Sequence, residues 1–195
     1  DNTLGLDTGG VQPDVYVLLV NTTNERHTAV GRAVAARELH TLNPAYESAY
    51  NLHPRSLEQR VALELLLDPE IPLVSLIGQA GTGKTLLALA AGLASTQRSS
   101  RYEKLLVSRP VIPLGRDIGY LPGTKDEKMH LWMQPIFDNL SYLMGLHNGG
   151  HQDEAAEQGV RRLLREERIE LEALTYIRGR SISRQYVIID EAQNL

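Results

Sequence analysis

The chain of 195 residues contains no cysteine. This absence excludes disulfides, thiolate zinc sites and a cysteine nucleophile, and it is typical of the reducing cytoplasm, where we expect the protein. No apolar run reaches the roughly 18 residues that span a bilayer, so no membrane segment is expected. The N-terminus also lacks the basic region and the apolar core of a signal peptide. The first residue is Asp1 and not methionine, which is compatible with a piece of a longer protein.

An excess of positive charge is lacking as well. Twenty Lys and Arg residues stand against 24 Asp and Glu residues, for a formal net charge of −4. This balance argues against a generally basic surface for nucleic acid but leaves room for a local basic patch. The hydrophobic content of 42% is ordinary for a globular protein. The length suits one α/β domain or such a domain with a small appendage.

One strong motif is present. The apolar run Leu73–Ile77 leads into an octet that fits the Walker A or P-loop pattern G-x-x-x-x-G-K-[ST], and good helix formers follow at once. We therefore expect a buried strand before the octet and a helix after it, the setting in which backbone N–H groups and a helix N-terminus bind phosphate. Lys84 is expected at the β- and γ-phosphates, and the hydroxyl of Thr85 at Mg²⁺. The octet consists of Gly78, Gln79, Ala80, Gly81, Thr82, Gly83, Lys84 and Thr85.

A second apolar run, Tyr186–Asp190, matches a Walker B strand and is followed by Glu191. In P-loop enzymes the strand's aspartate holds the Mg²⁺ that the P-loop hydroxyl also contacts, so Asp190 is the expected metal ligand beside Thr85. Glu191 is then the candidate general base that activates the attacking water. Alternatively, the two acids are solvated residues at the end of an ordinary strand. A P-loop kinase of small substrates would not need Glu191.

The remaining elements divide the chain into two parts. Residues 1–10 are linker-like, and the runs Val15–Val20 and Thr28–Val34 predict a β-hairpin, so residues 1–50 are expected to form a small β-rich appendage. Residues 51–195 are expected to form the nucleotide-binding domain. Its predicted helices and strands are 56–67, 104–108, 124–143, 154–168 and 169–174, with a long loop over 111–123.

Blocks from the second part, taken together, resemble the PhoH-like ATPase family. The blocks are residues 71–85, 106–123, 132–140, 174–182 and 187–195. The resemblance implies an α/β P-loop NTPase fold, a three-layer sandwich with a mostly parallel sheet, similar to the core of superfamily 1 helicases. Longer bacterial members carry an N-terminal PIN ribonuclease domain, and residues 1–50 resemble the connector between the two parts.

The same resemblance implies ATP and Mg²⁺ as ligands, ATP hydrolysis, single-stranded RNA as a partner and a hexamer-like ring. It also implies that Gln59 reads the adenine edge. The residues themselves offer another role, because Ser56 and Gln59 fit a capping box at the start of a helix. Both roles stay open at this point.

The sequence departs from the family pattern in one respect, because it stops at Leu195, soon after Walker B. The family's later sensor strand would lie between the P-loop strand and the Walker B strand in related folds. Without it the sheet is expected to be incomplete, with buried backbone groups unsatisfied unless Leu73–Ile77 and Tyr186–Asp190 pair directly. These 195 residues alone are therefore expected to be poorly soluble or dimeric and to bind ATP weakly.

Arginines raise the question of nucleic acid. Arg178, Arg180 and Arg184 lie in an acid-free stretch, and Arg109 follows a predicted strand. Beside a helicase-like core, Arg109, Arg178 and Arg180 are candidates for a groove that follows single-stranded RNA. An arginine finger on a neighbouring subunit's phosphates or plain solvated charges are the alternatives. The function hypotheses are thus an RNA-coupled ATPase, a nucleotide-gated RNA-binding or assembly module with little turnover, and a P-loop small-molecule kinase.

Overall fold

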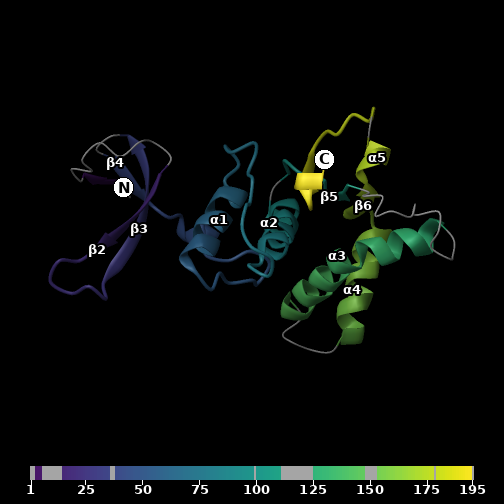
Figure 1. Ribbon diagram of the computed structural model, residues 1–195, viewed down its shortest axis with the longest axis horizontal. Coiled ribbons are helices and arrows are strands. Elements are labelled where there is room, and N and C mark those ends of the chain that lie inside the picture. The colour runs from purple at the N-terminus through teal and green to yellow at the C-terminus, as the bar shows by residue number, and fades with distance from the viewer. Residues whose placement is uncertain are drawn as a thin grey trace.

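Two sheets, with helices packed on the second, make up the part of the chain that the structure describes (Figure 1). This computed structural model describes residues 3–5, 15–35, 38–98, 100–110, 125–147, 153–177 and 179–194. Among the helices in these ranges, none combines the length and the apolar character needed to cross a membrane.

The N-terminal sheet is antiparallel, with the strand order β1–β4–β3–β2. Its strands are β1 (Thr3–Gly5), β2 (Tyr16–Val20), β3 (Thr28–Ala35) and β4 (Glu38–Thr41). The predicted hairpin is present, because β2 pairs with β3 in antiparallel register. The Asn21 side chain stabilises the connection by accepting hydrogen bonds from the backbone N–H groups of Thr23 and Asn24, at 2.8 and 3.0 Å.

The linker-like interpretation of residues 1–10 is wrong for Thr3–Gly5. This segment forms a strand that pairs with β4, with Leu4 opposite Leu39. Leu39 is 1% exposed, so the pairing adds a strand beside a buried position. Composition near the N-terminus could not show this, because the partner strand is more than thirty residues away in the sequence. The other residues of 1–10 lie outside the described part of the chain.

The second sheet is parallel, with the order β6–β5–β7. Its strands are β5 (Lys104–Arg109), β6 (Ile169–Ala173) and β7 (Gln185–Ile189), all within about one residue of the predicted runs. The central strand β5 is covered on both faces, since Leu105, Leu106 and Val107 are almost fully buried. Ser108 lies opposite Ile189 across the parallel pair β5–β7. The residues that follow these two positions, Arg109 and Asp190, therefore leave the sheet at the same C-terminal end of the strands.

Helices pack against this parallel sheet or against one another and supply much of its core. They are α1 (Leu57–Leu67), α2 (Lys84–Arg98), α3 (Lys125–His147), α4 (Asp153–Arg165) and the short α5 (Leu174–Ile177), with 3₁₀ turns at Pro44–Tyr46 and Ala192–Asn194. Ser56 caps α1 as predicted, because its Oγ accepts a hydrogen bond from the Gln59 N–H at 3.3 Å. The predicted loop over 111–123 and the predicted helix start at Thr124 lie outside the described residues.

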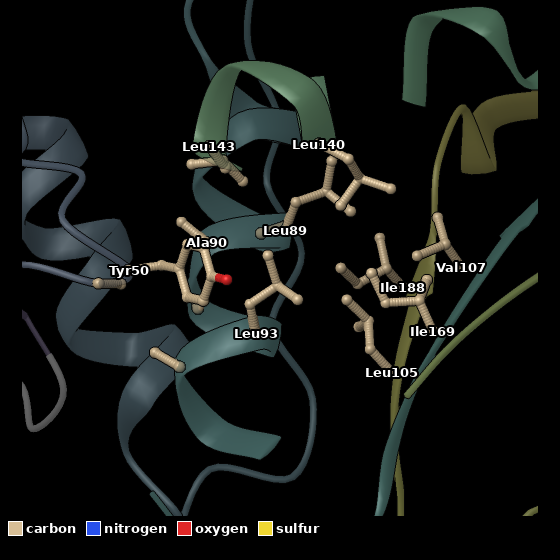
Figure 2. Packing of buried hydrophobic residues seen from close by; sticks show 14 of the residues in the cluster. Tyr50, Leu89, Ala90, Leu93, Leu105, Val107, Leu140, Leu143, Ile169 and Ile188 are labelled. Atoms are coloured by element: carbon tan, nitrogen blue, oxygen red, sulfur yellow. The ribbon is translucent and has the colours of Figure 1, made fainter. Parts of the chain in front are cut away.

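The helix α2 is the centre of the core. Figure 2 shows Leu89 and Leu93 directed toward the sheet residues Leu105 and Ile188, while Tyr50 packs on another side of the helix. At Gly92 the helix approaches the sheet so closely that a Cβ atom would lie 2.6 Å from Leu105 Cδ1. The site favours glycine because a larger residue would displace the buried Leu105 side chain. This close approach holds the N-terminus of α2 against the C-terminal ends of β5 and β7.

One predicted strand is not formed. The run Leu73–Ile77 was expected to be a buried strand, but it belongs to neither sheet and has no β-pairing partner among the described residues. Leu73 is 82% exposed and Ile77 is 96% exposed, whereas Leu76 packs against the core. The direct pairing of this run with β7 is also absent from the described part of the chain. A strand needs a neighbour for its N–H and C=O groups, and apolar sequence alone does not supply one.

Candidate nucleotide site

The first six residues of the Walker A octet form a loop, and the last two, Lys84 and Thr85, are the first residues of α2. Gly81 and Gly83 have φ angles of 78° and 84°, in the left-handed region that glycine adopts without strain. A Cβ atom on Gly81 would meet nothing within 4 Å, so the requirement at this position is conformational. The Thr82 hydroxyl donates to the Gln79 carbonyl at 2.9 Å and closes the turn. The loop therefore has the backbone conformation and the helix N-terminus that a phosphate site needs.

Lys84 lies folded over its own loop. Its Nζ donates hydrogen bonds to the carbonyls of Gly78 and Gln79, at 2.8 and 2.7 Å. An ammonium carries three N–H groups, so these two bonds leave one further donor. The lysine charge is thus held at the mouth of the loop by two backbone contacts, from which it can turn toward an anion.

Gln59 connects helix α1 to the P-loop. Its Nε2 donates to the Thr82 carbonyl at 3.1 Å, and its Oε1 accepts from the Arg55 N–H at 2.7 Å. The side chain therefore accepts a hydrogen bond at the start of α1, in line with the predicted capping role, and it also contacts the P-loop, which the sequence did not predict. A Cβ atom on Gly83 would come within 3.3 Å of Gln59 Nε2, so the amide packs directly against the loop. The adenine-reading role stays a prediction.

Thr85 and Asp190 meet where α2 begins and β7 ends. The Thr85 hydroxyl donates to Oδ1 of Asp190 at 2.8 Å. Asp190 is held in place by its backbone as well, since its N–H donates to the Ser108 carbonyl at 2.9 Å. The Asp190 side chain is 12% exposed. A hydroxyl and a carboxylate are hard oxygen ligands of the kind Mg²⁺ prefers, so these two residues fit the expected metal.

Arg109 completes this group, although sequence reasoning assigned it to RNA or to a neighbouring subunit. Its Nε lies 3.2 Å from Oδ2 of Asp190 within the same chain. Its NH1 donates to the Trp132 carbonyl at 3.0 Å, and its Cζ lies 5.6 Å from the centroid of the Trp132 ring. Two neighbouring parallel strands have their C-terminal ends at the same end of a sheet, so residues that follow them lie close together. The sequence did not reveal that β5 and β7 are neighbours, and the contact between Arg109 and Asp190 was therefore not predicted.

Glu191 directly follows Asp190 and has a φ angle of 56°. A left-handed conformation is uncommon for a residue other than glycine and tends to occur at functional sites. The side chain is exposed, and its carboxylate accepts a hydrogen bond from Nε2 of Gln193. Glu191 is therefore near the Walker B carboxylate in the chain but is engaged with the following 3₁₀ turn.

The remaining arginine candidates lie away from this group. Arg180 donates to Glu172 at 2.6 Å and to Glu170 at 3.0 Å, both on β6. Hydrogen bonds from Lys104 and Arg180 lower the pKa of Glu170 to about 2, and the hydrogen bonds that Arg180 donates to the two glutamates raise the pKa of Arg180. Arg178 lies outside the described residues. The structure thus ties Arg180 into an internal ion-pair network and does not bring it to the Walker residues.

Thr85, which follows a glycine-rich loop, and Asp190, which follows a β-strand, meet as they do in P-loop nucleotide-binding proteins. The sequence profile of the family described as "PhoH-like protein" matches residues 51–195. The chain therefore belongs to the PhoH-like family, which has the P-loop fold and whose members are generally predicted to be ATPases.

Similar proteins agree with this assignment. The chain is 50% identical to "Protein PhoH2" of Bacillus subtilis over 184 residues, covering 94% of this chain and 40% of that protein. It is 44% identical to "Protein PhoH2" of Mycolicibacterium smegmatis over 168 residues, covering 86% of this chain and 36% of that protein. A "PhoH-like protein" of Bacillus subtilis is 36% identical over 118 residues, which are 60% of this chain and 33% of that protein. The chain thus spans about two fifths of the PhoH2 relatives it matches.

Proposed function

We propose that this chain binds ATP with Mg²⁺ between the P-loop and the end of β7, and that it hydrolyses the nucleotide. The observation that carries the proposal is the 2.8 Å contact between Thr85 and Asp190, which joins the two halves of a P-loop site across the fold. Bound Mg²⁺ would supply positive charge to the β- and γ-phosphates and to the transition state. Thr85 and Asp190 are the residues that would hold it.

The other residues have roles that follow from their positions. The backbone N–H groups of the octet Gly78–Thr85 surround the phosphates, and Lys84 exchanges one of its carbonyl contacts for a phosphate oxygen. Gln59 holds the loop through Thr82, and it contributes to adenine recognition once it leaves one of its two contacts with Thr82 and Arg55. Glu191 accepts a proton from the attacking water. For this last role Glu191 must leave its hydrogen bond to Gln193, so hydrolysis requires a local rearrangement.

The contact between Glu191 and Gln193 also favours a second candidate, a nucleotide-gated binding or assembly module with little turnover. Replacement of Glu191 by glutamine separates the two. In the natural full-length protein, Glu191→Gln should keep ATP binding and lower ATP turnover by about 10²-fold or more, the usual scale of general-base catalysis. The control is Gln193→Ala, which frees the carboxylate and should not lower turnover. Turnover that is unchanged by Glu191→Gln would favour the binding module.

We further propose that residues 51–195 are the nucleotide-binding domain, with a helicase-like three-layer core, and that residues 1–50 are an appendage. Leu73 and Ile77 are exposed, and the outer edge of β7 has no partner strand among the described residues, which supports a core in which a further strand lies between them. RNA coupling rests on the helicase-like resemblance, as does assembly into a ring. Arg178 remains a candidate contact for RNA, whereas Arg109 and Arg180 have partners within the chain.

RNA coupling is tested by the anisotropy of labelled single-stranded RNA at increasing salt concentration. If Arg178 contacts the backbone, Arg178→Ala weakens binding and flattens its salt dependence, because fewer counterions are released. Arg180→Ala is the matched control, since its guanidinium is already paired with Glu170 and Glu172. RNA binding that neither substitution alters would remove this stretch from the RNA site.

A further inference from the structure

We propose that Arg109 is a positioning residue for the metal carboxylate Asp190, and that it transmits occupancy of the metal site to Trp132 on helix α3. This inference rests on the proposed Mg²⁺-nucleotide site and names a regulatory connection of that site. It is carried by the placement of one guanidinium between Oδ2 of Asp190, the Trp132 carbonyl and the Trp132 ring.

The two oxygens of Asp190 have different partners. Oδ1 accepts from the Thr85 hydroxyl at 2.8 Å, and Oδ2 lies 3.2 Å from Arg109 Nε. The ion pair with Arg109 therefore sets the rotation of the carboxylate and leaves Oδ1 directed at the P-loop. Groups that orient a ligating carboxylate in this way commonly change metal affinity when they are removed.

The ion pair between Arg109 and Asp190 is largely buried, and its geometry suits arginine better than lysine. The side chains of Arg109 and Asp190 are 17% and 12% exposed, so water and salt screen the pair less than they screen a surface ion pair. The planar guanidinium uses Nε for the carboxylate and NH1 for the Trp132 carbonyl, and its plane is available to the indole ring. Lysine has one donor group at its tip and cannot make all of these contacts.

Occupation of the metal site would change the contact between Asp190 and Arg109. A divalent cation held at Oδ1 would fix the rotation of the Asp190 carboxylate, and so would change the position of Oδ2 relative to the Arg109 guanidinium. The guanidinium then retains its carbonyl and indole contacts and moves relative to the carboxylate. Because Trp132 lies in α3, the metal site and that helix are connected through the Arg109 side chain.

The experiment uses Trp132 fluorescence in the natural full-length protein. Trp132 is the single tryptophan of these 195 residues, and a Trp132→Phe variant identifies its share of the emission. ADP is added first in the presence of EDTA and then with increasing Mg²⁺, while calorimetry measures binding independently. We expect the Trp132 emission to change when Mg²⁺ is added to the nucleotide-bound protein, and to change much less with ADP alone.

Variants at Arg109 separate positioning from simple packing. Arg109→Ala should lose the Trp132 response and raise the Mg²⁺ concentration for half-maximal nucleotide binding about 10-fold or more. Arg109→Lys keeps the charge beside Asp190, so it should restore most of the Mg²⁺ dependence without restoring the Trp132 response. The matched control is Arg101→Ala, because Arg101 also contacts a carbonyl and an aromatic ring, at Pro69 and Tyr102, away from Asp190. It should leave both measurements unchanged.

The outcomes distinguish this inference from the proposed function. If the wild-type protein binds Mg²⁺-ADP by calorimetry but Arg109→Ala shows the same Mg²⁺ dependence and the same Trp132 response, the role of Arg109 is wrong and the nucleotide site stands. Equal losses in Arg109→Ala and Arg101→Ala would also overturn it, because the effect would then be general destabilisation. If calorimetry detects no nucleotide binding by the wild type, the proposed function fails, and the role of Arg109 fails with it.

Discussion

The hydroxyl of Thr85 donates a hydrogen bond of 2.8 Å to Oδ1 of Asp190, although 105 positions separate the two residues in the sequence. Two features of the fold produce this contact. Parallel pairing with β5 places the C-terminal ends of β5 and β7 side by side, and the packing of α2 against the same sheet brings the helix N-terminus to these strand ends. The strength of that packing should therefore be measurable by substitution at the helix–sheet contact.

Gly92 is the position where that packing is tightest. A Cβ atom there would lie 2.6 Å from Leu105 Cδ1 and 3.0 Å from Tyr186 Cδ1. Gly92→Ala should lower the free energy of unfolding by about 1–3 kcal/mol through overpacking, even though alanine is the better helix former. The matched control is Gly145→Ala in α3, where a Cβ atom meets nothing within 4 Å and the change should stabilise by about 0.5–1 kcal/mol. Urea unfolding of both variants measures the change in the free energy of unfolding. An equal change in the two variants would contradict the packing argument.

The ion-pair network on β6 should make stability depend on pH. Hydrogen bonding to Lys104 lowers the pKa of Glu170 from its ordinary 4.5 to about 2. A lowered folded-state pKa contributes stability above the unfolded-state value, and this contribution is lost as the pH falls from about 4.5 to about 2. Glu170→Gln should therefore be less stable than the wild type at pH 7, and the difference should shrink across that window.

Urea unfolding at a series of pH values compares the two proteins. The control is Glu157→Gln, which removes an exposed pair with Arg161 on α4 and should change stability little at neutral pH. A difference between Glu170→Gln and the wild type that stays constant from neutral pH to pH 2 would show that the network does not lower the pKa of Glu170.

Exposed apolar residues predict self-association of the 195-residue chain. Leu73 is 82% exposed, and Val187 is 39% exposed on β7, whose far edge has no partner strand among the described residues. Such edges and patches associate with other chains. Leu73→Lys combined with Val187→Lys should reduce the average mass in sedimentation experiments. Tyr142→Lys, at an exposed site on α3, should not. A monomeric wild-type chain would contradict the prediction.

The sequence predicted the elements that depend on local signals. Ser56 caps α1 because its hydroxyl reaches an N–H three residues away, and the helix after the P-loop follows from good helix formers. The apolar runs of β5 and β7 were also located closely.

The structural features that the sequence did not predict depend on partners that are distant along the chain. Thr3–Gly5 forms a strand only because β4 pairs with it, and Leu73–Ile77 stays outside both sheets because no described strand lies beside it. The contact between Arg109 and Asp190 was not predicted, because the sequence does not reveal that β5 pairs with β7, and the candidate role of Arg109 toward RNA or a neighbour's phosphates stays a prediction.

The most direct test of the nucleotide site is calorimetry of Mg²⁺-ATP binding to the natural full-length protein and to its Lys84→Ala variant. The substitution removes the charge that Lys84 holds against the Gly78 and Gln79 carbonyls, whereas the hydrogen bond between Thr82 and Gln79 that closes the turn does not involve Lys84. Thermal unfolding of both proteins checks that the fold is retained. We predict that the wild type binds and that Lys84→Ala loses most of the affinity. Equal affinities in two folded proteins would contradict the assignment of this loop as the phosphate site.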